Sequence, residues 1–158
     1  MKVFLASPLG FMESSRPFIS RLVEVLEESG HTVLDPWSLA EPFTTEQESA
    51  RRVTDENIRR AELHRINMAI ARQNHRLLEE ADGMLAVLDG SDVDSGTASE
   101  IGCAFGIGGK MIHGYRGDFR RAGENDGCRV NLQVQYWIEQ SGGRIYTSLE
   151  ALRDCRWA

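Results

Sequence analysis

The segment of this chain best suited to chemistry runs from Asp92 to Glu100 and reads DVDSGTASE. Three carboxylates are gathered there among small residues, a few positions after the apolar run Met84–Leu88. That run predicts a buried strand, and the pattern after it predicts a helix over Thr97–Ile107. Because ligands of α/β folds bind beyond the carboxyl ends of the strands, the segment is a candidate catalytic or binding site.

A purely structural interpretation of the same segment is also open. Thr97 and Glu100 match a capping box, in which the first residue caps a helix and the glutamate reaches back to a backbone N–H. This interpretation leaves Asp92 and Asp94 unexplained, and like charges gathered in one loop cost stability unless something uses them. A calcium-binding loop is excluded because Cys103 stands where such a loop requires its final glutamate.

Asn74 continues an apolar stripe at helical spacing that is formed by Leu63, Ile66, Ile70 and Leu77. An amide on a buried helix face must find hydrogen-bond partners. Asn74 is therefore either a satisfied core residue or a group that contacts the polar edge of a ligand.

The loops after the first two expected strands carry residues suited to a flat ligand. Gly10 permits close approach of the backbone, and Phe11 could form a wall of the site. Trp37 follows the second strand and suits either a stacking surface or a core position. Further along the chain, Asn131 has the residue type and position of a helix N-cap.

Strand patterns alternate with helical patterns along the chain, and this order predicts the fold class. Strands are expected at Lys2–Ala6, His31–Leu34, Met84–Leu88, Lys110–Gly114 and Arg144–Tyr146, and helices at Pro17–Ser29, Glu46 to about Glu80, Thr97–Ile107, Asn131–Gln140 and Ser148–Arg153. We expect Leu39–Thr45 to be loop and the long helical stretch to be broken near Asp55. The alternation predicts an α/β fold in a single domain over residues 1–158. It should be doubly wound (flavodoxin-like or Rossmann-like), with a five-stranded parallel sheet and helices on both faces.

Composition argues against several classes of function. The 158 residues carry a net charge of −6 without a basic stripe, which argues against a nucleic-acid polymer as a partner. The three cysteines and four histidines form no metal-ligand pattern, so we expect neither a metal nor a cofactor, and a reducing, cytoplasmic location. The apolar N-terminal run ends at Pro8 and is too short to cross a membrane.

Four blocks of the sequence resemble, in the same order, those of the nucleoside 2-deoxyribosyltransferase family. The blocks are Leu5–Phe11, Arg72–Asn74 ahead of Ala81 and Asp82, Asp94–Ala104, and Val130–Leu132. The resemblance implies a transferase that moves the 2-deoxyribosyl group between the nucleobases of 2′-deoxynucleosides with retention of configuration. Its substrates would be 2′-deoxynucleosides and free purine or pyrimidine bases, with hydrolysis as a side reaction.

The resemblance also implies roles for individual residues. Glu100 corresponds to a nucleophile that attacks C1′ and forms a covalent deoxyribosyl intermediate, and the helix N-terminus should keep it ionised. Asp94 corresponds to an aspartate that contacts the nucleoside, and Asn74 to a residue near the base. Asn131 corresponds to an asparagine lent by a neighbouring subunit to the sugar 5′-hydroxyl, which implies a homo-oligomer with shared active sites. The remaining residues expected to bind substrate are Gly10, Phe11, Trp37 and Asp92.

The sequence departs from the family at two positions and leaves two other functions open. Phe4 stands where many members carry a tyrosine that hydrogen-bonds the nucleophile, and Asn74 stands where others carry an aspartate. One alternative is an N-glycosidase of 2′-deoxynucleoside 5′-monophosphates, with Ser14–Arg16 holding the phosphate. We favour a helix start for that segment. The other alternative is a nucleotide-binding module without chemistry, which the carboxylate of Glu100 opposes because it would repel an anionic ligand.

Overall fold

The computed structural model describes residues 1–157 and contains a sheet of five parallel strands. The strands are β1 (Lys2–Ala6), β2 (Thr32–Leu34), β3 (Gly83–Val87), β4 (Met111–Tyr115) and β5 (Ile145–Tyr146). Their order is β2-β1-β3-β4-β5, and every neighbouring pair is parallel. Each strand lies within one residue of its expected bounds. In this order the chain winds in opposite directions from β1 and from β3, so the crevice between their carboxyl ends is where a ligand is expected.

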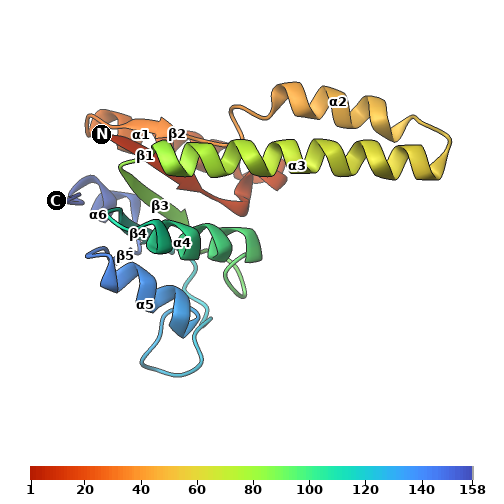
Figure 1. Cartoon of the computed structure of the whole chain (residues 1–158). Coiled ribbons are helices and arrows are strands. Elements are labelled where there is room, and N and C mark those ends of the chain that lie inside the picture. The colour runs from red at the N-terminus through yellow and green to blue at the C-terminus, as the bar shows by residue number, and fades with distance from the viewer. Residues whose placement is uncertain (158) are drawn as a thin grey trace.

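Helices cover both faces of the sheet, as predicted (Figure 1). Alternate strand residues point to opposite faces, so Phe4 and Ala6 enter one core and Val3 and Leu5 the other. The first core is closed by the helices α3 (Glu56–Glu80), α4 (Ser95–Ile107) and α5 (Leu132–Gln140). The second is closed by α1 (Arg16–Glu28) and α6 (Leu149–Arg153).

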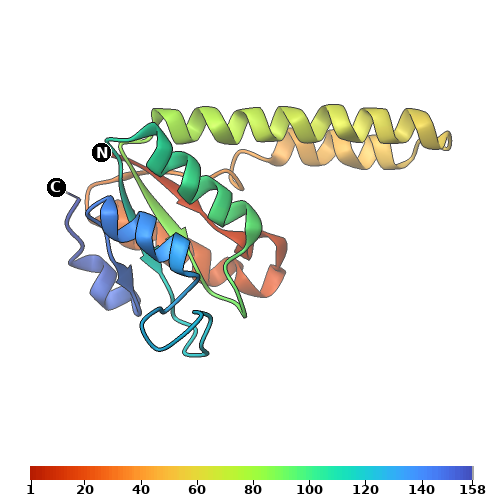
Figure 2. The ribbon, with the colours of Figure 1, turned by 60° about the horizontal axis from the view of Figure 1, so that its bottom comes forward.

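The helices α2 (Glu41–Arg51) and α3 form a hairpin that extends well beyond the sheet (Figure 2). Asp55 starts α3 as its N-cap, because its Oδ1 accepts hydrogen bonds from the backbone N–H groups of Asn57 at 2.9 Å and Ile58 at 3.0 Å. This confirms the predicted break near Asp55. The prediction that Leu39–Thr45 is loop was wrong beyond Ala40, because Pro42 lies in the first turn of α2, where a proline fits a helix.

The C-terminal tail packs at the edge of the sheet where the strands begin. Trp157 lies against Gly83, where an added Cβ would come within 2.9 Å of the indole ring. The ring also packs edge-on against His113, with ring centroids 4.5 Å apart. The N-terminus and Trp157, the last described residue, therefore lie at the end of the sheet opposite the carboxyl ends of β1 and β3 (Figure 1). A role for the C-terminal residue, Ala158, lies outside the described residues.

None of the described helices has both the length and the apolar character needed to cross a membrane. Over residues 1–157, no three His, Cys, Asp or Glu side chains are placed so that they could hold a metal ion.

Candidate active site

A cavity of about 480 Å³ lies at the carboxyl end of β1. Its walls come from the turn after β1, the segment after β2, the helices α2 and α3, and the first turns of α4. Five of the residues expected from the sequence to form the site line it: Phe11, Trp37, Asn74, Asp94 and Glu100. The fold thus brings together residues that are up to about ninety positions apart in the chain, as the edge of a doubly wound sheet is expected to do.

Glu100 lies in the second turn of α4 and is half-buried in this cavity. Burial, and secondly the negative charge of Asp94, raise the pKa of its carboxyl from 4.5 to about 7. The expectation that the helix N-terminus keeps Glu100 ionised was therefore wrong. Glu100 is the sixth residue of the helix, beyond the free N–H groups of the first turn, and the nearest charge is another carboxylate.

Asp94 is the N-cap of α4. Its Oδ2 accepts a hydrogen bond from the backbone N–H of Thr97 at 3.0 Å and lies 3.5 Å from the Thr97 hydroxyl oxygen. The predicted capping box was wrong, because the helix begins at Ser95 and Thr97 is an almost fully buried residue within its first turn. The loop therefore uses one carboxylate to fix the helix and places the next one, Glu100, in the cavity.

Asn74 reaches the cavity from α3, one turn after Ile70, which also lines it. Leu78 follows one turn later and is buried in the core. Asn74 is half-buried, and none of the described hydrogen bonds engages its side chain. Of the two interpretations of Asn74, the structure favours a group that contacts a ligand.

Two aromatic rings line the cavity at nearly right angles to each other. The rings of Phe11 and Trp37 meet edge to face, with centroids 4.5 Å apart and an interplanar angle of 81°. The indole Nε1 of Trp37 donates a hydrogen bond to the carbonyl of Ser7 at 2.8 Å, which fixes the ring. Gly10 does not line the cavity itself. It lies under Trp37, where an added Cβ would fall 2.1 Å from the indole ring.

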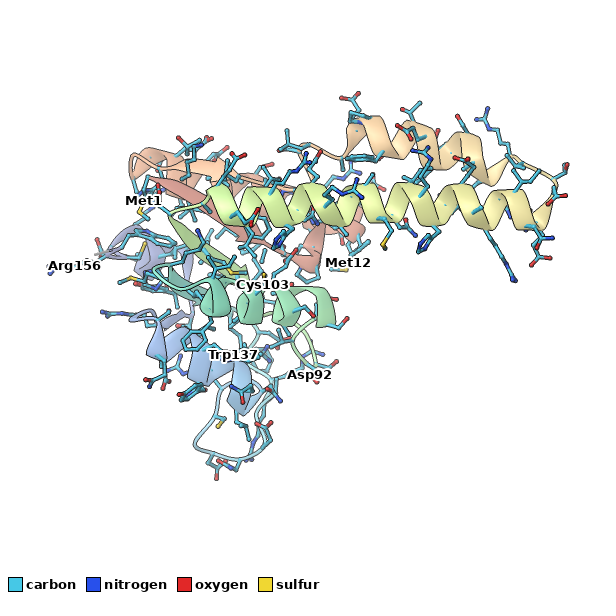
Figure 3. All side chains as sticks on the ribbon, viewed as in Figure 1. Met1, Met12, Asp92, Cys103, Trp137 and Arg156 are labelled. Atoms are coloured by element: carbon cyan, nitrogen blue, oxygen red, sulfur yellow. The ribbon has the colours of Figure 1, made fainter. Side chains whose placement is uncertain are left out.

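Two further expected site residues lie outside this cavity. Asp92 is exposed on the loop before α4, where its Oδ1 accepts a hydrogen bond from the N–H of Val93 at 2.7 Å (Figure 3). Asn131 is the N-cap of α5, as its alternative interpretation predicted: its Oδ1 accepts from the N–H of Gln133 at 3.0 Å. Its Nδ2 donates to Glu124 at 2.9 Å. Neither residue contributes to the cavity of its own chain.

The position of Phe4 shows what the missing tyrosine hydroxyl means for Glu100. Phe4 is fully buried in the core formed with α4, in the same cluster as Ile101. Among the described residues no hydrogen-bond donor contacts the Glu100 carboxylate. The carboxylate is therefore placed by the helix and by burial, and no neighbouring hydroxyl orients it.

Three lining residues from α2 were missed by the sequence analysis: Phe43, Thr44 and Gln47. Phe43 and Thr44 were missed because the start of α2 was taken for loop, and Gln47, although expected to be helical, was not singled out. The spacing of Phe43, Gln47 and Ala50 fits one helix face, and this spacing together with Pro42 would have located them. Gln47 donates from Nε2 to Asn67 Oδ1 at 3.3 Å, and it adds a second amide side chain, after that of Asn74, to the cavity lining.

Arg116 and Asp118 connect the loop after β4 to the loop after β3, beside the site. The sequence alone suggested no role for either residue. The guanidinium of Arg116 is buried and donates to the carbonyls of Leu88 and Gly90, at the end of β3. The backbone N–H of Asp118 donates to Asp89 Oδ1 at 2.7 Å. These contacts fix the loop that leads from β3 to the N-cap of α4.

The charged side chains that line the cavity are all acidic. The lining contains two carboxylates, Asp94 and Glu100, and no lysine, arginine or histidine among the described residues. The segment Ser14–Arg16, considered as a phosphate site, does not line it; it forms the end of a 3₁₀ turn and the first residue of α1. The cavity therefore suits an uncharged ligand with a flat ring and polar edges.

Comparisons with known proteins agree with this fold. Residues 3–133 match the family model described as nucleoside 2-deoxyribosyltransferase. A search of curated proteins gave no match. The structure is similar to that of a 2-deoxyribosyltransferase from Bacillus psychrosaccharolyticus, with a TM-score of 0.70 and 19% identity over 99% of this chain and 93% of that one.

Two further solved structures share the fold at low sequence identity. One is a 2-deoxyribosyltransferase from Leishmania mexicana, with a TM-score of 0.62 and 18% identity over 95% of this chain and 92% of that one. The other is a CMP N-glycosidase from Clostridium botulinum, with a TM-score of 0.54 and 20% identity over 97% and 96%. The family model covers most of the chain, including β1 to β4 and the cavity. The chain belongs to the nucleoside 2-deoxyribosyltransferase family.

Proposed function

We propose that the protein transfers the 2-deoxyribosyl group between nucleobases of 2′-deoxynucleosides, with Glu100 as the nucleophile. One observation carries this proposal. Within a chain of this family, a half-buried glutamate faces a cavity walled by Phe11 and Trp37, whose rings suit a nucleobase. A carboxylate beside a sugar carbon can form a glycosyl ester that a second acceptor then displaces.

The reaction proceeds in two displacements at C1′. An oxygen of Glu100 bonds to C1′ while the C1′–N bond breaks and its electron pair leaves with the base. A nitrogen of the second base then attacks C1′, the bond to Glu100 breaks, and the incoming base loses its N–H proton. Two inversions give net retention. Water in place of the second base gives hydrolysis, which we expect as the side reaction.

The surrounding residues hold the nucleoside for this attack. Asp94 keeps one carboxylate oxygen on the N-terminus of α4, and we assign its other oxygen to a sugar hydroxyl. The amides of Asn74 and Gln47 lie where they could hydrogen-bond the edge of a base that is held against Trp37. Base and sugar would thus be recognised by different walls of the cavity.

A nucleoside fits the cavity better than a nucleoside monophosphate. A 5′-phosphate would enter a lining that holds two carboxylates and, among the described residues, no basic side chain. The charge repulsion and the absence of a bidentate arginine argue against the monophosphate hydrolysis known for the structural neighbour from C. botulinum.

We also propose that the protein assembles as a homo-oligomer in which Asn131 serves the site of a neighbouring subunit. Asn131 does not line its own cavity, and its Oδ1 is used only as an acceptor of N–H groups at the start of α5. Its Nδ2 carries two N–H bonds and donates one of them to Glu124, so the other stays available for a hydroxyl group. The free thiols of Cys103, Cys128 and Cys155 fit a cytoplasmic location.

A transfer assay tests the proposal directly. Incubation of 2′-deoxyinosine with adenine should give 2′-deoxyadenosine and hypoxanthine, and chromatography measures both products. Glu100→Ala should abolish the reaction. Glu48→Ala, which removes an exposed glutamate of α2 outside the cavity, should leave the rate unchanged. Release of base from 2′-deoxyinosine 5′-monophosphate without transfer to adenine would instead favour the hydrolase, and binding without turnover would favour the non-catalytic module.

A further inference from the structure

The cavity contains very few groups that could donate a proton to a departing base. Among the described residues that line it, only Asp94 and Glu100 are ionisable. The other polar side chains in the lining are hydroxyls and amides, which are far too weakly acidic to give up a proton near neutral pH.

Neither carboxyl group is free to act as that acid. If Glu100 is the nucleophile, its carboxylate must be ionised before attack, and it then forms the bond to C1′. Asp94 Oδ2 accepts the backbone N–H of Thr97 at the N-terminus of α4, where negative charge is favoured. A carboxyl group that is held as a hydrogen-bond acceptor in this way is a poor source of a proton.

Asn74 lines the cavity from α3 and presents an amide, not an acid, to it. Its side chain takes part in none of the described hydrogen bonds, so its NH2 group can donate to the base. An amide stabilises negative charge on a leaving group by hydrogen bonding, but it does not transfer the proton. General acids typically contribute about 10² to 10⁴-fold to such steps, and this contribution is missing here.

We infer that the protein selects its donor substrates by how readily their base leaves, because Asn74 cannot protonate the departing base. The inference rests on the proposed transfer reaction. The base leaves with the electron pair of the C1′–N bond and takes its proton from water. Preferred donors are therefore 2′-deoxynucleosides whose nucleobase either carries a positive charge before it leaves or forms a stable, weakly basic anion when it leaves. Ordinary 2′-deoxynucleosides react slowly.

The test uses two pairs of donor nucleosides, and the two members of a pair share a base skeleton but differ in how readily the base leaves. The pairs are 2′-deoxyguanosine with 7-methyl-2′-deoxyguanosine for purines, and 2′-deoxyuridine with 5-fluoro-2′-deoxyuridine for pyrimidines. Single-turnover base release is measured with whichever pair is turned over. The 7-methyl nucleoside should react about 100-fold faster, and the fluorinated one about tenfold faster, than its partner.

Asn74→Asp places a carboxylic acid at the same position with nearly the same shape. It should speed the poorer donor of each pair by about tenfold or more and leave the better donor within about threefold. It should also add a fall in rate at high pH, because the new acid must be protonated. Asn57→Asp makes the same change at an exposed position on α3 outside the cavity and should alter neither rate.

The outcomes separate this inference from the proposed function. If wild-type protein shows less than about a threefold preference within a pair, and Asn74→Asp gives no gain, a general acid acts on the base and the inference is wrong. The transferase proposal would survive that result. If no donor of either pair loses its base, the proposed function itself fails.

Discussion

Asp94 caps α4 and Glu100 lies in the second turn of that helix, where the charge of Asp94 adds to the effect of burial on the pKa of Glu100. Asp94 caps the helix through the N–H of Thr97 at 3.0 Å, which fixes its negative charge near the half-buried Glu100. Burial and this charge together bring the pKa of Glu100 to about 7. A group that must be ionised to react is therefore half protonated near neutral pH.

The first prediction concerns the pH dependence of the reaction. Only ionised Glu100 can attack C1′, so kcat/KM should rise with pH through about pH 7 and level off above it. The measurement is kcat/KM for 2′-deoxyinosine and adenine over a pH series at constant ionic strength. If Glu100 acted as a general acid instead, kcat/KM would fall as the pH rises through the same value.

The second prediction separates the charge of Asp94 from its capping role. Asn at position 94 can still accept the Thr97 N–H, so Asp94→Asn should keep the helix but remove the charge that raises the pKa of Glu100. The rise of kcat/KM with pH should move to lower pH in Asp94→Asn. In addition, kcat should fall if the carboxylate oxygen of Asp94 that does not cap the helix binds the sugar. Asp92→Asn removes an exposed charge of the same loop and should leave the rise in place. An unmoved rise in both variants would assign the raised pKa to burial alone.

The third prediction concerns stability. The folded protein keeps a proton on Glu100 up to about pH 7, whereas the unfolded chain releases it near pH 4.5. The contribution of Glu100 to the stability of the wild type should therefore decline as the pH rises between these values, by at most about 3 kcal/mol. Glu100→Gln should have a larger free energy of unfolding than wild type at about pH 8. Below about pH 4.5, the free energies of unfolding of the two proteins should be equal. Urea unfolding at the two pH values measures the difference, and equal stability at the higher pH would contradict it.

The fourth prediction concerns the aromatic wall. Gly10→Ala places a Cβ where the indole of Trp37 now lies, 2.1 Å from the ring, so the ring must move. We expect KM for the nucleoside to rise about tenfold with a smaller change in kcat, because a binding surface is lost and the nucleophile is untouched. Gly106→Ala on α4, where no atom lies within 4 Å of an added Cβ, should leave KM unchanged. An unchanged KM in Gly10→Ala would remove Trp37 from the binding surface.

The sheet and most helices were predictable because their sequence patterns are local. The strands are short apolar runs, and the helices begin at residues with capping side chains such as Asp55 and Asn131. The start of α2 was missed because only Phe43, Gln47 and Ala50 face inward and the remaining surface is polar. The cap of α4 was misplaced because both Asp94 and Thr97 can cap a helix, and tertiary burial of Thr97 decided between them.

The chemistry of the site was only partly predictable for a related reason. The residue types and order identified Glu100, Asp94, Asn74, Phe11 and Trp37 as candidates that one cavity now joins. The raised pKa of Glu100 depends on burial, which is a property of the packed fold. The pairing of Gly10 with Trp37 likewise joins two loops that are distant in sequence.

The most direct test of the account is to trap the intermediate on Glu100. A 2′-deoxy-2′-fluoroarabinosyl nucleoside slows both displacements, because fluorine at C2′ destabilises the positively charged transition state. Mass spectrometry of protein treated with this nucleoside should show one added fluorodeoxyarabinosyl group, mapped by peptide analysis to Glu100 and absent from Glu100→Gln. A label on Asp94, or steady turnover of 2′-deoxyinosine by Glu100→Gln, would contradict the assignment of Glu100 as the nucleophile.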